Sequence, residues 1–530
     1  MSNPHDRELP APMFEGAQER EVANVASLLR QSAAATPDEA ALREESGDTT
    51  YAELDERSNR AANAFAALGV GVGDRIAIVS ANNHYFMELV FAAAKLGAIA
   101  APINTRLSAV EIEKLLSTAE PKVLFVGAEA TEQTPPEGAV PSLAVTLTPQ
   151  SYDELIATAD ATDPGYEASA DETAILLFSS GTTGLPKGIP LNGRNLSTSL
   201  YGSGDRLKVE GHQISMAPVP FFHVTGLTSA LGTIGKGGTL LLKMPTGPKD
   251  LMRLLIEEKV TNAVGVPTLI QMLTQLPEAK GADWSHLQYF GYGGAPMPLP
   301  VIKAAREILG CELVQGYGLT ETSAAVTVLM PEDHVPAPGR EKQVGSVGRP
   351  LEGVEIKIVD PATREEVAVG ERGEVWVRSS RVTPGYWNRP EENSRSFTDD
   401  RWFATGDGGS VDEEGYLYLH DRIKDMIVTG AENVYPAEVE SVITGHPDVS
   451  EVAVIGIPSP KWGESPYAII VPRPGTTPDA DEIIAWTREQ IAHYKAPVGI
   501  TFTDVLPRNP NGKLLKRVLR DQYADVQAPQ

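Results

Sequence analysis

Cysteine is almost absent from this sequence, since Cys311 is the only one in 530 residues. One cysteine cannot form an internal disulfide, so a reducing compartment is the simplest setting and we predict a cytoplasmic protein. Cys311 stands in the apolar segment ILGCELV. That setting favours a small buried core residue over a reactive thiol.

Long apolar runs are also missing. The longest candidate, LVFAAAKLGAIAAPI at 89–103, contains Lys95 and is shorter than the roughly 20 residues that span a bilayer. The first residues, MSNPHDRELPAPMFEG, lack the basic and apolar blocks of a signal peptide. We therefore expect no integral membrane segment.

Positive charge is scarce. The 45 Lys and Arg residues stand against 71 Asp and Glu, which gives a net charge of −26. Such a surface repels the phosphates of nucleic acids and of anionic membranes, so we expect no nucleic acid partner. Apolar residues make up 42% of the chain, which is enough for globular packing.

The chain is too long for one ordinary hydrophobic core, and helical and strand patterns alternate along its first part. Such alternation is typical of parallel sheets with crossover helices. The segment 128–170, rich in Pro, Thr and acidic residues, is expected to be an irregular surface excursion. Helical patterns cover 25–37, 51–69, 86–97 and 251–260, and strand patterns cover 75–80, 122–127, 174–178 and 239–244.

From about residue 345 the pattern changes to short strands with glycine turns, and beyond 424 it becomes a compact α+β pattern. We therefore predict an α/β fold: a large N-terminal domain of α/β sheets with a β-rich subdomain, and a smaller α+β C-terminal domain. The predicted bounds are 1–421 for the first domain, including a loose arm at 1–20, and 425–530 for the second.

A loop rich in glycine and hydroxyl residues, SSGTTGLPKG at 179–188, follows the strand pattern at 174–178. Glycines let backbone N–H groups approach phosphate oxygens, hydroxyls add donors, and Lys187 adds a positive charge. The loop is not a Walker A motif, because Pro186 stands where its second glycine would fall and Gly188 replaces the magnesium-binding hydroxyl.

This loop resembles the signature of the adenylate-forming superfamily, which includes acyl-CoA synthetases, luciferases and peptide-synthetase adenylation domains. The resemblance covers nearly the whole chain in the family's order and is nearest to fatty- or aryl-acyl-CoA synthetases. The other matching segments are PVPFFHVTGL (218–227), GYGGAPMP (291–298), QGYGLTET (315–322), GSVGRP (345–350), FATGDGG (403–409), DRIKDMIVTGAENVYPAEVE (421–440), KWGE (461–464) and LPRNPNGKLLKR (506–517).

The resemblance implies a two-step ATP-dependent acid–thiol ligase with Mg²⁺ as cofactor. A carboxylate attacks the α-phosphate of ATP to give acyl-AMP and pyrophosphate, and a thiol then displaces AMP. Two anions meet in the first step, so cations and oriented donors must stabilise its transition state.

The family's nucleotide-binding residues map onto both halves of the chain. The loop at 179–187 would hold the β- and γ-phosphates, Tyr317 would stack on adenine, Asp407 would accept the ribose hydroxyls, and Arg422 would contact ribose or phosphate. The full predicted set is Ser179, Ser180, Gly181, Thr182, Thr183, Gly184, Lys187, Gly294, Ala295, Pro296, Gln315, Gly316, Tyr317, Thr320, Asp407, Arg422 and Lys513.

Four residues match the family's catalytic positions. Glu321 would bind Mg²⁺, with Thr320 beside the α-phosphate. Lys513 would bridge the substrate carboxylate and the α-phosphate. His223 would lie near the acyl pocket and the thiol channel, although a lone histidine is often only structural.

Apolar residues around His223 match the acyl pocket and favour a hydrophobic, fatty acid over acetate or a dicarboxylate. The predicted pocket residues are Phe222, His223, Val224, Leu227, Tyr292 and Gly293.

By the same resemblance, residues 422–424 form a hinge in which Lys424 occupies the hinge position, and the C-terminal domain is mobile. Lys513 would leave after adenylation, and the loop with Gly430, Ala431 and Glu432 would then line the pantetheine tunnel. Many relatives have a second glycine where this chain has Ala431, and the added methyl puts the tunnel geometry in doubt.

Several readings of the motifs stay open. Coenzyme A and the phosphopantetheine of an acyl carrier protein share the pantetheine arm, so the motifs do not separate these two acceptors. A luciferase-like oxidation lacks support, and a peptide-synthetase module is disfavoured because no carrier domain follows. An inactive acyl- or nucleotide-binding relative would show gaps among the reactive residues, which are all present. The family also implies a homodimer by analogy.

Overall fold

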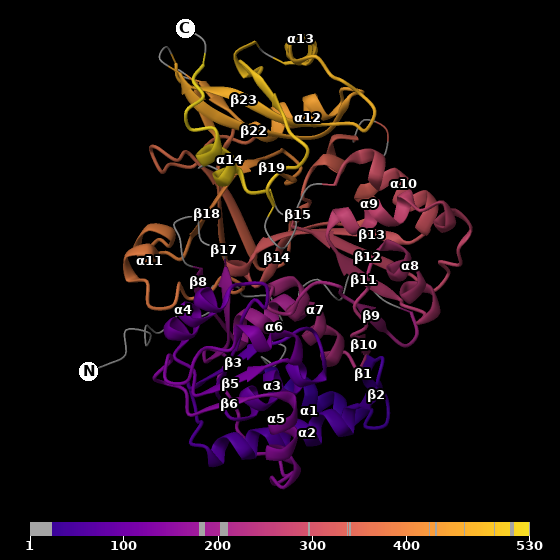
Figure 1. Cartoon of the computed structure of the whole chain (residues 1–530), viewed down its shortest axis with the longest axis vertical. Helices are drawn as coiled ribbons and strands as arrows, with labels where there is room; N and C mark the ends of the chain where they lie inside the picture. Colours follow the sequence, from indigo (N-terminus) through magenta and orange to yellow (C-terminus); the bar gives the residue numbers. More distant parts are fainter. Residues whose placement is uncertain are drawn as a thin grey trace. The chain divides into compact units, whose positions relative to one another are not determined.

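The computed structural model describes the chain except for residues 1–23, 180–185, 202–209, 295–296, 336–337, 339–340, 423–424, 430–431, 460–461, 492, 509–513 and 529–530. The chain divides into two compact units, which we call unit 1 (residues 1–355 and 377–403) and unit 2 (residues 356–376 and 404–530) (Figure 1). The predicted α/β class, with a larger N-terminal and a smaller C-terminal part, is confirmed. The predicted hinge at 422–424 falls within unit 2 and stays a prediction.

Unit 1 contains a six-stranded sheet in the order β6-β5-β3-β4-β7-β8. Strands β3, β4, β5, β6 and β7 pair in parallel, as the alternating pattern predicted, and only β8 runs antiparallel. The bounds are β3 Arg75–Val79, β4 Ile99–Pro102, β5 Val123–Val126, β6 Val145–Leu147, β7 Thr173–Ser179 and β8 Lys187–Asn192.

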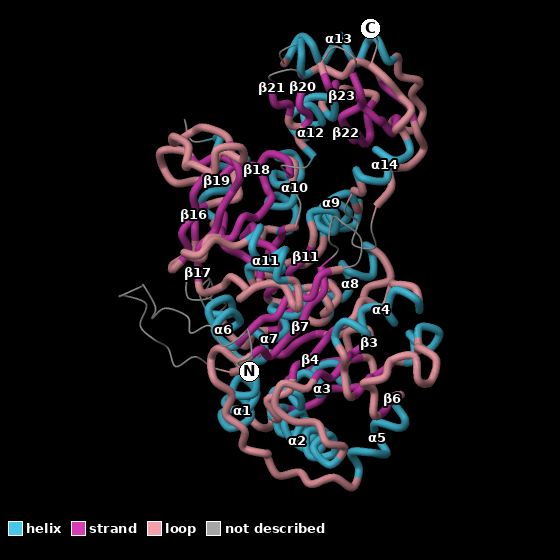
Figure 2. The backbone as a smooth tube through the Cα atoms, turned by 90° about the vertical axis from the view of Figure 1, so that its left-hand side faces the viewer, coloured by secondary structure: helices cyan, strands magenta, loops and turns pink. Residues whose placement is uncertain are grey.

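Helices cover both faces of this sheet (Figure 2). Along β3, Ile76 and Ile78 join the core cluster that holds residues of α2 and α3, whereas Ala77 and Val79 join the cluster of α4. Successive side chains of a strand point to opposite faces, so β3 is buried on both sides, as parallel strands generally are. The helices are α2 Tyr51–Ala67, α3 His84–Lys95 and α4 Ala109–Ala119.

A nine-stranded sheet, also in unit 1, has the order β15-β14-β13-β12-β11-β9-β10-β1-β2. Its strands β12 and β13 run parallel, and β14 returns antiparallel to β13. The bounds are β1 Ala40–Glu44, β2 Gly47–Thr50, β9 Ile214–Met216, β10 Thr239–Leu241, β11 Asn262–Gly265, β12 Tyr289–Gly293, β13 Glu312–Leu319, β14 Ala324–Leu329 and β15 Arg349–Pro350.

Two of the remaining helices of unit 1, α1 and α8, confirm the helices predicted at 25–37 and 251–260. The remaining helices are α1 Val25–Ala35, α5 Pro149–Ala157, α6 Gly193–Tyr201, α7 Val224–Gly235, α8 Pro248–Glu257, α9 Pro267–Gln275, α10 Leu299–Leu309 and α11 Pro390–Ser396, with 3₁₀ turns η1 Ala128–Gln133, η2 Pro277–Gly281, η3 Thr320–Thr322, η4 Pro331–His334 and η5 Glu341–Gly345. Among the described residues, no helix combines the length and the hydropathy that a membrane span requires.

The prediction that 128–170 is irregular is wrong, because this segment contains η1, β6 and α5. A capping box between Thr148 and Ser151 begins α5, and Pro149 occupies its first turn. Proline breaks helices in their interior but is favoured in their first turn, so its presence here marks a helix start.

Unit 2 follows the predicted short strands and α+β pattern. A four-stranded sheet has the order β16-β17-β18-β19, with a few end residues of β16, β17 and β18 counted in unit 1, and a five-stranded sheet has β21-β20-β23-β22 with β24 beside β23. The bounds are β16 Val354–Val359, β17 Gly373–Ser379, β18 Phe403–Val411, β19 Leu417–Arg422, β20 Ile427–Thr429, β21 Glu432–Val434, β22 Val449–Ser459, β23 Gly463–Pro472, β24 Ile500–Phe502, α12 Pro436–Thr444, α13 Ala480–Gln490 and α14 Lys516–Gln522, with a 3₁₀ turn η7 His493–Lys495.

A further expectation concerns the single cysteine. Cys311 is buried, as predicted, and burial raises the pKa of its thiol to about 12, so it is not a nucleophile at neutral pH.

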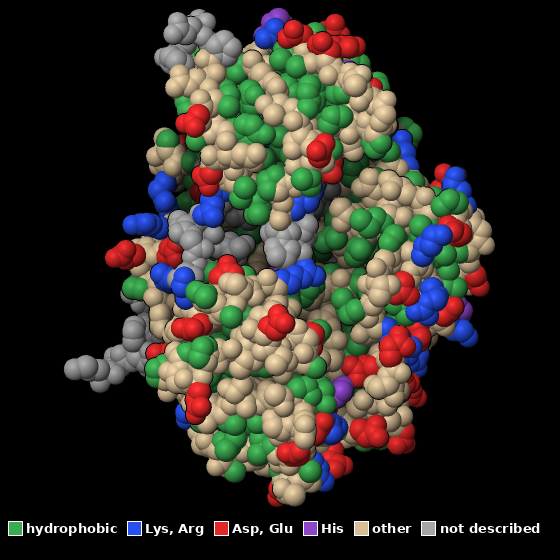
Figure 3. Space-filling view, in the orientation of Figure 1, with side chains coloured by type: hydrophobic (Ala, Val, Ile, Leu, Met, Phe, Trp, Pro, Cys, Tyr) green, Lys and Arg blue, Asp and Glu red, His purple; other side chains and the backbone are tan. Residues whose placement is uncertain are grey.

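Around α8, acidic and basic side chains are interspersed on the surface (Figure 3), where Arg253 pairs with Asp250 and Glu257.

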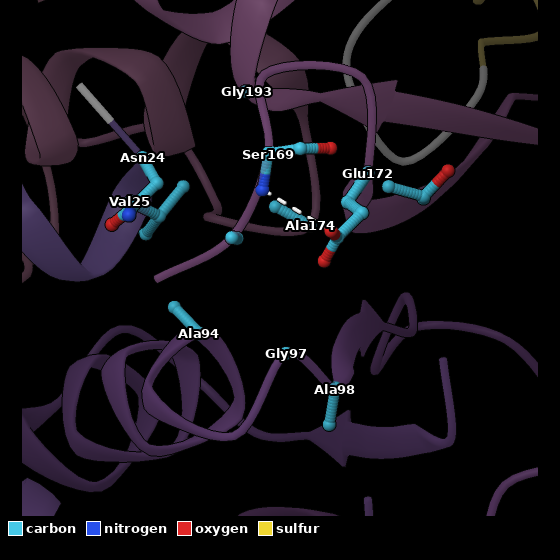
Figure 4. Close-up of a pocket in the computed structure, with 11 residues that line it drawn as sticks. Asn24, Val25, Ala94, Gly97, Ala98, Ser169, Glu172, Ala174 and Gly193 are labelled. Atoms are coloured by element: carbon cyan, nitrogen blue, oxygen red, sulfur yellow. Dashed lines mark hydrogen bonds between the residues drawn. The ribbon is translucent and has the colours of Figure 1, made fainter. Parts of the chain in front are cut away.

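A small cavity lies where the start of α1, the end of α3 and the segment 168–174 meet (Figure 4). Its volume is about 10 Å³, roughly the space of one water molecule. The cavity shares no lining residue with the predicted acyl pocket.

Arg381 is a buried cation without a carboxylate among the described residues. Its side chain is 1% exposed; its Nη1 donates to the Ala325 carbonyl at 3.3 Å, while its Nε and Nη2 have no partner among the described residues. Burial lowers the pKa of its guanidinium to about 10. An unpaired buried charge is costly, so Arg381 destabilises unit 1.

Replacing Arg381 with methionine should therefore stabilise the protein. An unsatisfied buried polar group costs about 1–3 kcal/mol, so Arg381→Met should raise Tm by about 2–4 °C. Differential scanning calorimetry measures this shift. Arg378→Met is the control and should lower Tm, because Arg378 pairs with Glu355 at 2.6 Å. A lower Tm in Arg381→Met would contradict the prediction.

The ion pair of His84 with Glu44, at 2.7 Å, gives a pH-dependent contribution to stability. Burial opposes the charge on His84, but the hydrogen bond and charge of Glu44 outweigh it and raise the pKa of the imidazole. A raised folded-state pKa stabilises the protein below the unfolded pKa, and this contribution is lost as pH rises through the folded value. The Tm difference between the unmodified protein and His84→Gln should be larger at pH 6 than at pH 9; an equal difference at both would contradict this.

Candidate active site

The predicted phosphate loop connects two paired strands of unit 1. Strands β7 and β8 form an antiparallel hairpin in which Ser179 lies opposite Lys187. The two flanking residues of the loop are therefore neighbours at its base. The other predicted loop residues, Ser180, Gly181, Thr182, Thr183 and Gly184, lie outside the described residues.

Lys187 is held by an acid and an aromatic ring. Its Nζ lies 2.7 Å from Glu392 Oε1 and 4.6 Å from the centre of the Tyr386 ring. Its side chain is 16% exposed. A half-buried ion pair over an aromatic face restricts the ammonium group to one position at the base of the loop.

The predicted adenine and acyl residues meet at the carboxyl ends of β12 and β13. In the parallel register, Tyr292 lies beside Gln315, and Gly293 lies beside Gly316. A Cβ at Gly293 would come within 2.5 Å of the Gly316 carbonyl oxygen, so this close approach requires glycine. Tyr317 is buried, with 8% exposed.

The end of β13 continues directly into η3, which carries Thr320 and Glu321. Both side chains are half-buried. The hydroxyl of Tyr386 donates to Glu321 Oε1 at 3.2 Å, and the backbone N–H of Thr383 donates to the Glu321 carbonyl at 2.7 Å. Glu321 is thus fixed in both its main chain and its side chain.

A single carboxylate fits a magnesium ion that arrives with a nucleotide. Mg²⁺ is usually bound by one or two carboxylates together with substrate phosphates and water. Among the described residues, no cluster of three His, Cys, Asp or Glu side chains would form a protein-only metal site. The donor set therefore fits Mg²⁺ carried by ATP and bound at Glu321.

The predicted acyl residues are placed in two hydrophobic clusters. Val224 and Leu227 of α7 lie in the core cluster that packs on the six-stranded sheet, whereas Tyr292 lies in the cluster around α8 to α10. His223 precedes α7 as its N-cap, and its ring lies 4.6 Å from that of Phe222.

The sequence did not reveal the partner of Tyr292. Its hydroxyl lies 2.9 Å from Nε2 of buried His334, and Nδ1 of His334 lies 2.9 Å from the Met330 carbonyl. Burial lowers the pKa of His334. A neutral imidazole accepting from the phenol therefore fixes the Tyr292 ring.

The predicted ribose contacts lie in unit 2. Asp407 on β18 is opposite Arg422 on β19 in the antiparallel register. The backbone N–H of Asp407 donates to the Thr405 hydroxyl at 3.0 Å, which orients the turn.

Four of the seven predicted residues of unit 2 lie outside the described residues, namely Lys424, Gly430, Ala431 and Lys513, as do Ala295 and Pro296 of unit 1. Gly294 is described and has a φ of +77°. The backbone of Glu432 pairs with Thr429 in the hairpin of β20 and β21.

Five Lys and Arg residues fall within 508–520, and three of them have partners within unit 2. Arg508 pairs with Glu451, Lys516 with Glu440 at 2.9 Å, and Arg520 with Asp425 at 2.6 Å. These three cations are therefore engaged within unit 2 itself.

Comparison with known proteins agrees with this geometry. The description "AMP-binding enzyme" matches residues 29–387, and "AMP-binding enzyme C-terminal domain" matches residues 438–513. The chain is 39% identical to the long-chain-fatty-acid–CoA ligase FadD13 of Mycobacterium tuberculosis, over 94% of this chain and 99% of that protein. It is 35% identical to the fatty acid–[acyl-carrier-protein] ligase ScoC of Streptomyces coeruleorubidus, over 89% and 91%.

A solved structure with similar coverage is ATP-bound MatB from Rhodopseudomonas palustris. Its TM-score is 0.87, with 32% identity over 94% of this chain and 99% of that chain. The chain therefore belongs to the AMP-binding enzyme family. The predicted superfamily and the predicted class, AMP-forming acid–thiol ligases, are confirmed.

Glu321→Gln tests the site directly. The amide keeps the size of the side chain but removes its charge, so we expect the rate of acyl-adenylate formation to fall about 100-fold or more. Pyrophosphate release under single-turnover conditions measures this rate. A rate within fivefold of the unmodified protein would show that Glu321 does not act in adenylation.

Proposed function

We propose that this protein activates a hydrophobic carboxylic acid, of the fatty acid class, with ATP and transfers the acyl group to coenzyme A. A substrate carboxylate oxygen attacks the α-phosphorus, the bond from that phosphorus to the bridging oxygen breaks, and pyrophosphate leaves. A thiolate then attacks the acyl carbon, and AMP leaves with the electron pair of the broken C–O bond. The apolar residues Phe222, Val224, Leu227 and Tyr292 support a hydrophobic acyl group.

One observation carries this proposal. Lys187 and Glu321 are 134 residues apart in sequence, yet both contact Tyr386. The cation that we assign to the triphosphate and the carboxylate that we assign to the metal therefore contact the same side chain. Attack on a triphosphate by a carboxylate requires such charges side by side.

The residues have distinct roles in the first step. Lys187 and the loop at 179–187 bind the β- and γ-phosphates, Thr320 lies at the α-phosphate, and Asp407 and Arg422 bind the ribose. Glu321 would hold Mg²⁺, which would neutralise phosphate charge. Lys513 bridges the two reacting anions during adenylation.

The second step completes the proposal. Residues 422–424 form the hinge about which the C-terminal domain rotates, removing Lys513 and bringing the 430–432 loop to the pantetheine tunnel. His223 lies near the thiol channel. A cytoplasmic location, a homodimer and an acyl carrier protein as partner belong to this proposal too, the carrier because of the similarity to ScoC.

Pyrophosphate exchange tests the adenylation step. With a panel of fatty and aromatic acids, the unmodified protein should exchange labelled pyrophosphate into ATP, and Lys513→Ala should reduce exchange about 100-fold. Arg517→Ala is the matched control, because Arg517 is an exposed cation four residues away on α14. No exchange with any acid would remove the enzymatic proposal.

Mass spectrometry of the products identifies the acceptor. Coenzyme A and a phosphopantetheinylated carrier protein are offered separately with an acid that supports exchange. We expect an acyl-CoA thioester. Acylation of the carrier alone would overturn the coenzyme A assignment and leave adenylation intact.

A further inference from the structure

A segment that lies outside the family motifs connects the hairpin of β7 and β8 to η3. We call residues 379–392 the strap; they run from the end of β17 to the start of α11. The Ser323 hydroxyl donates to the Arg381 carbonyl at 2.9 Å, and the Thr383 hydroxyl donates to the Pro190 carbonyl at 2.6 Å. The Trp387 N–H donates to the Gly188 carbonyl at 2.8 Å. The strap is therefore bonded both to β8 and to the residues that flank Glu321.

Tyr386 stands at the centre of the strap with its side chain 6% exposed. Its backbone is fixed by Asn393, whose Oδ1 accepts from the Tyr386 N–H at 2.6 Å and whose Nδ2 donates to the Tyr386 carbonyl at 3.1 Å. Its ring packs edge-on against Phe397 at 5.8 Å. A ring anchored at both its backbone and its edge has little freedom to move.

This anchored ring has one charged group at its hydroxyl and another over its face. The hydroxyl donates to Glu321 Oε1, and the Lys187 ammonium lies over the ring, where Glu392 also holds it. Groups that orient a metal ligand through its second oxygen commonly change metal affinity 10- to 100-fold when they are removed.

We propose that Tyr386 is a positioning residue for ATP and its metal: its hydroxyl orients the Glu321 carboxylate, and its ring, together with Glu392, orients the Lys187 ammonium. This inference rests on the proposed roles of Glu321 and Lys187 in ATP binding. It assigns separable tasks to two parts of one side chain. The hydroxyl orients the carboxylate that binds the metal, and the ring orients the ammonium group that binds the triphosphate.

Two substitutions separate these tasks. Tyr386→Phe removes the hydroxyl and keeps the ring. The Mg²⁺ concentration for half-maximal ATP binding should therefore rise about 10-fold. The affinity for ATP at saturating Mg²⁺ should change by less than about twofold. Tyr386→Leu removes both the hydroxyl and the ring and should also weaken ATP binding at saturating Mg²⁺ about fivefold. Isothermal titration calorimetry with ATP and no acid measures both quantities on the full chain.

Tyr85→Phe is the matched control. The Tyr85 hydroxyl donates to Asp153 at 2.8 Å, so this variant loses the same kind of hydrogen bond elsewhere in unit 1. It should bind ATP with unchanged Mg²⁺ dependence. The contrary outcome is that Tyr386→Phe loses thermal stability, as Tyr85→Phe does, and still binds ATP with the Mg²⁺ dependence of the unmodified protein. That result would mean that Tyr386 contributes only to packing, and it would overturn the proposal.

Glu392→Gln tests the other side of the ring. Without the carboxylate charge the Lys187 ammonium is less restricted, so the dissociation constant of ATP should rise about threefold. Glu391→Gln, an exposed neighbour at the start of α11, should leave it unchanged. Tighter ATP binding in Glu392→Gln would mean that Glu392 competes with the triphosphate for Lys187, and unchanged binding would mean that Glu392 does not affect Lys187. Either result would overturn its assigned role.

The binding assay also separates this inference from the proposed function. If the unmodified protein binds Mg·ATP but exchanges pyrophosphate with no acid, the ligase proposal fails while the Tyr386 variants still test the positioning role. If exchange occurs and Tyr386→Phe shows normal Mg²⁺ dependence, only the positioning role fails.

Discussion

Electrostatic repulsion between a carboxylate and a triphosphate is the constraint on which the rest of this structure depends. The chain has a net charge of −26, so general attraction for anions is not available to it. Positive charge must instead be placed locally and held in position. We propose Lys187 as such a charge, since Glu392 and the Tyr386 ring hold it where β8 begins.

The strap gives this local arrangement its rigidity. Glu321 lies in η3, directly after strand β13 of the nine-stranded sheet, whereas Lys187 begins β8 of the six-stranded sheet. Side-chain and backbone hydrogen bonds from residues 383–387 reach Glu321 on one sheet's side and the backbone of β8 on the other. Preorganised charges require no rearrangement during the reaction, which is the main source of electrostatic catalysis.

The parallel strands supply the second part of the arrangement. Strands β12 and β13 end beside each other, so residues matching the acyl pocket and the adenine site become neighbours. Ligands of α/β folds generally bind at this carboxyl edge. Antiparallel pairing performs a similar task in unit 2, where it sets Asp407 opposite Arg422.

The sequence alone was sufficient for the α/β class, the superfamily and the elements with clear periodicity, because hydrophobic spacing and dense motifs are local properties. Helix α5 was missed because Pro149 signals either a break or a start, and only its capping contact with the following turn decides which. The partnerships of Tyr386 with Glu321 and Lys187, and of Tyr292 with His334, were decided by the tertiary structure. They join residues far apart in the chain, and no local pattern encodes a contact that exists only after sheets and strap have packed.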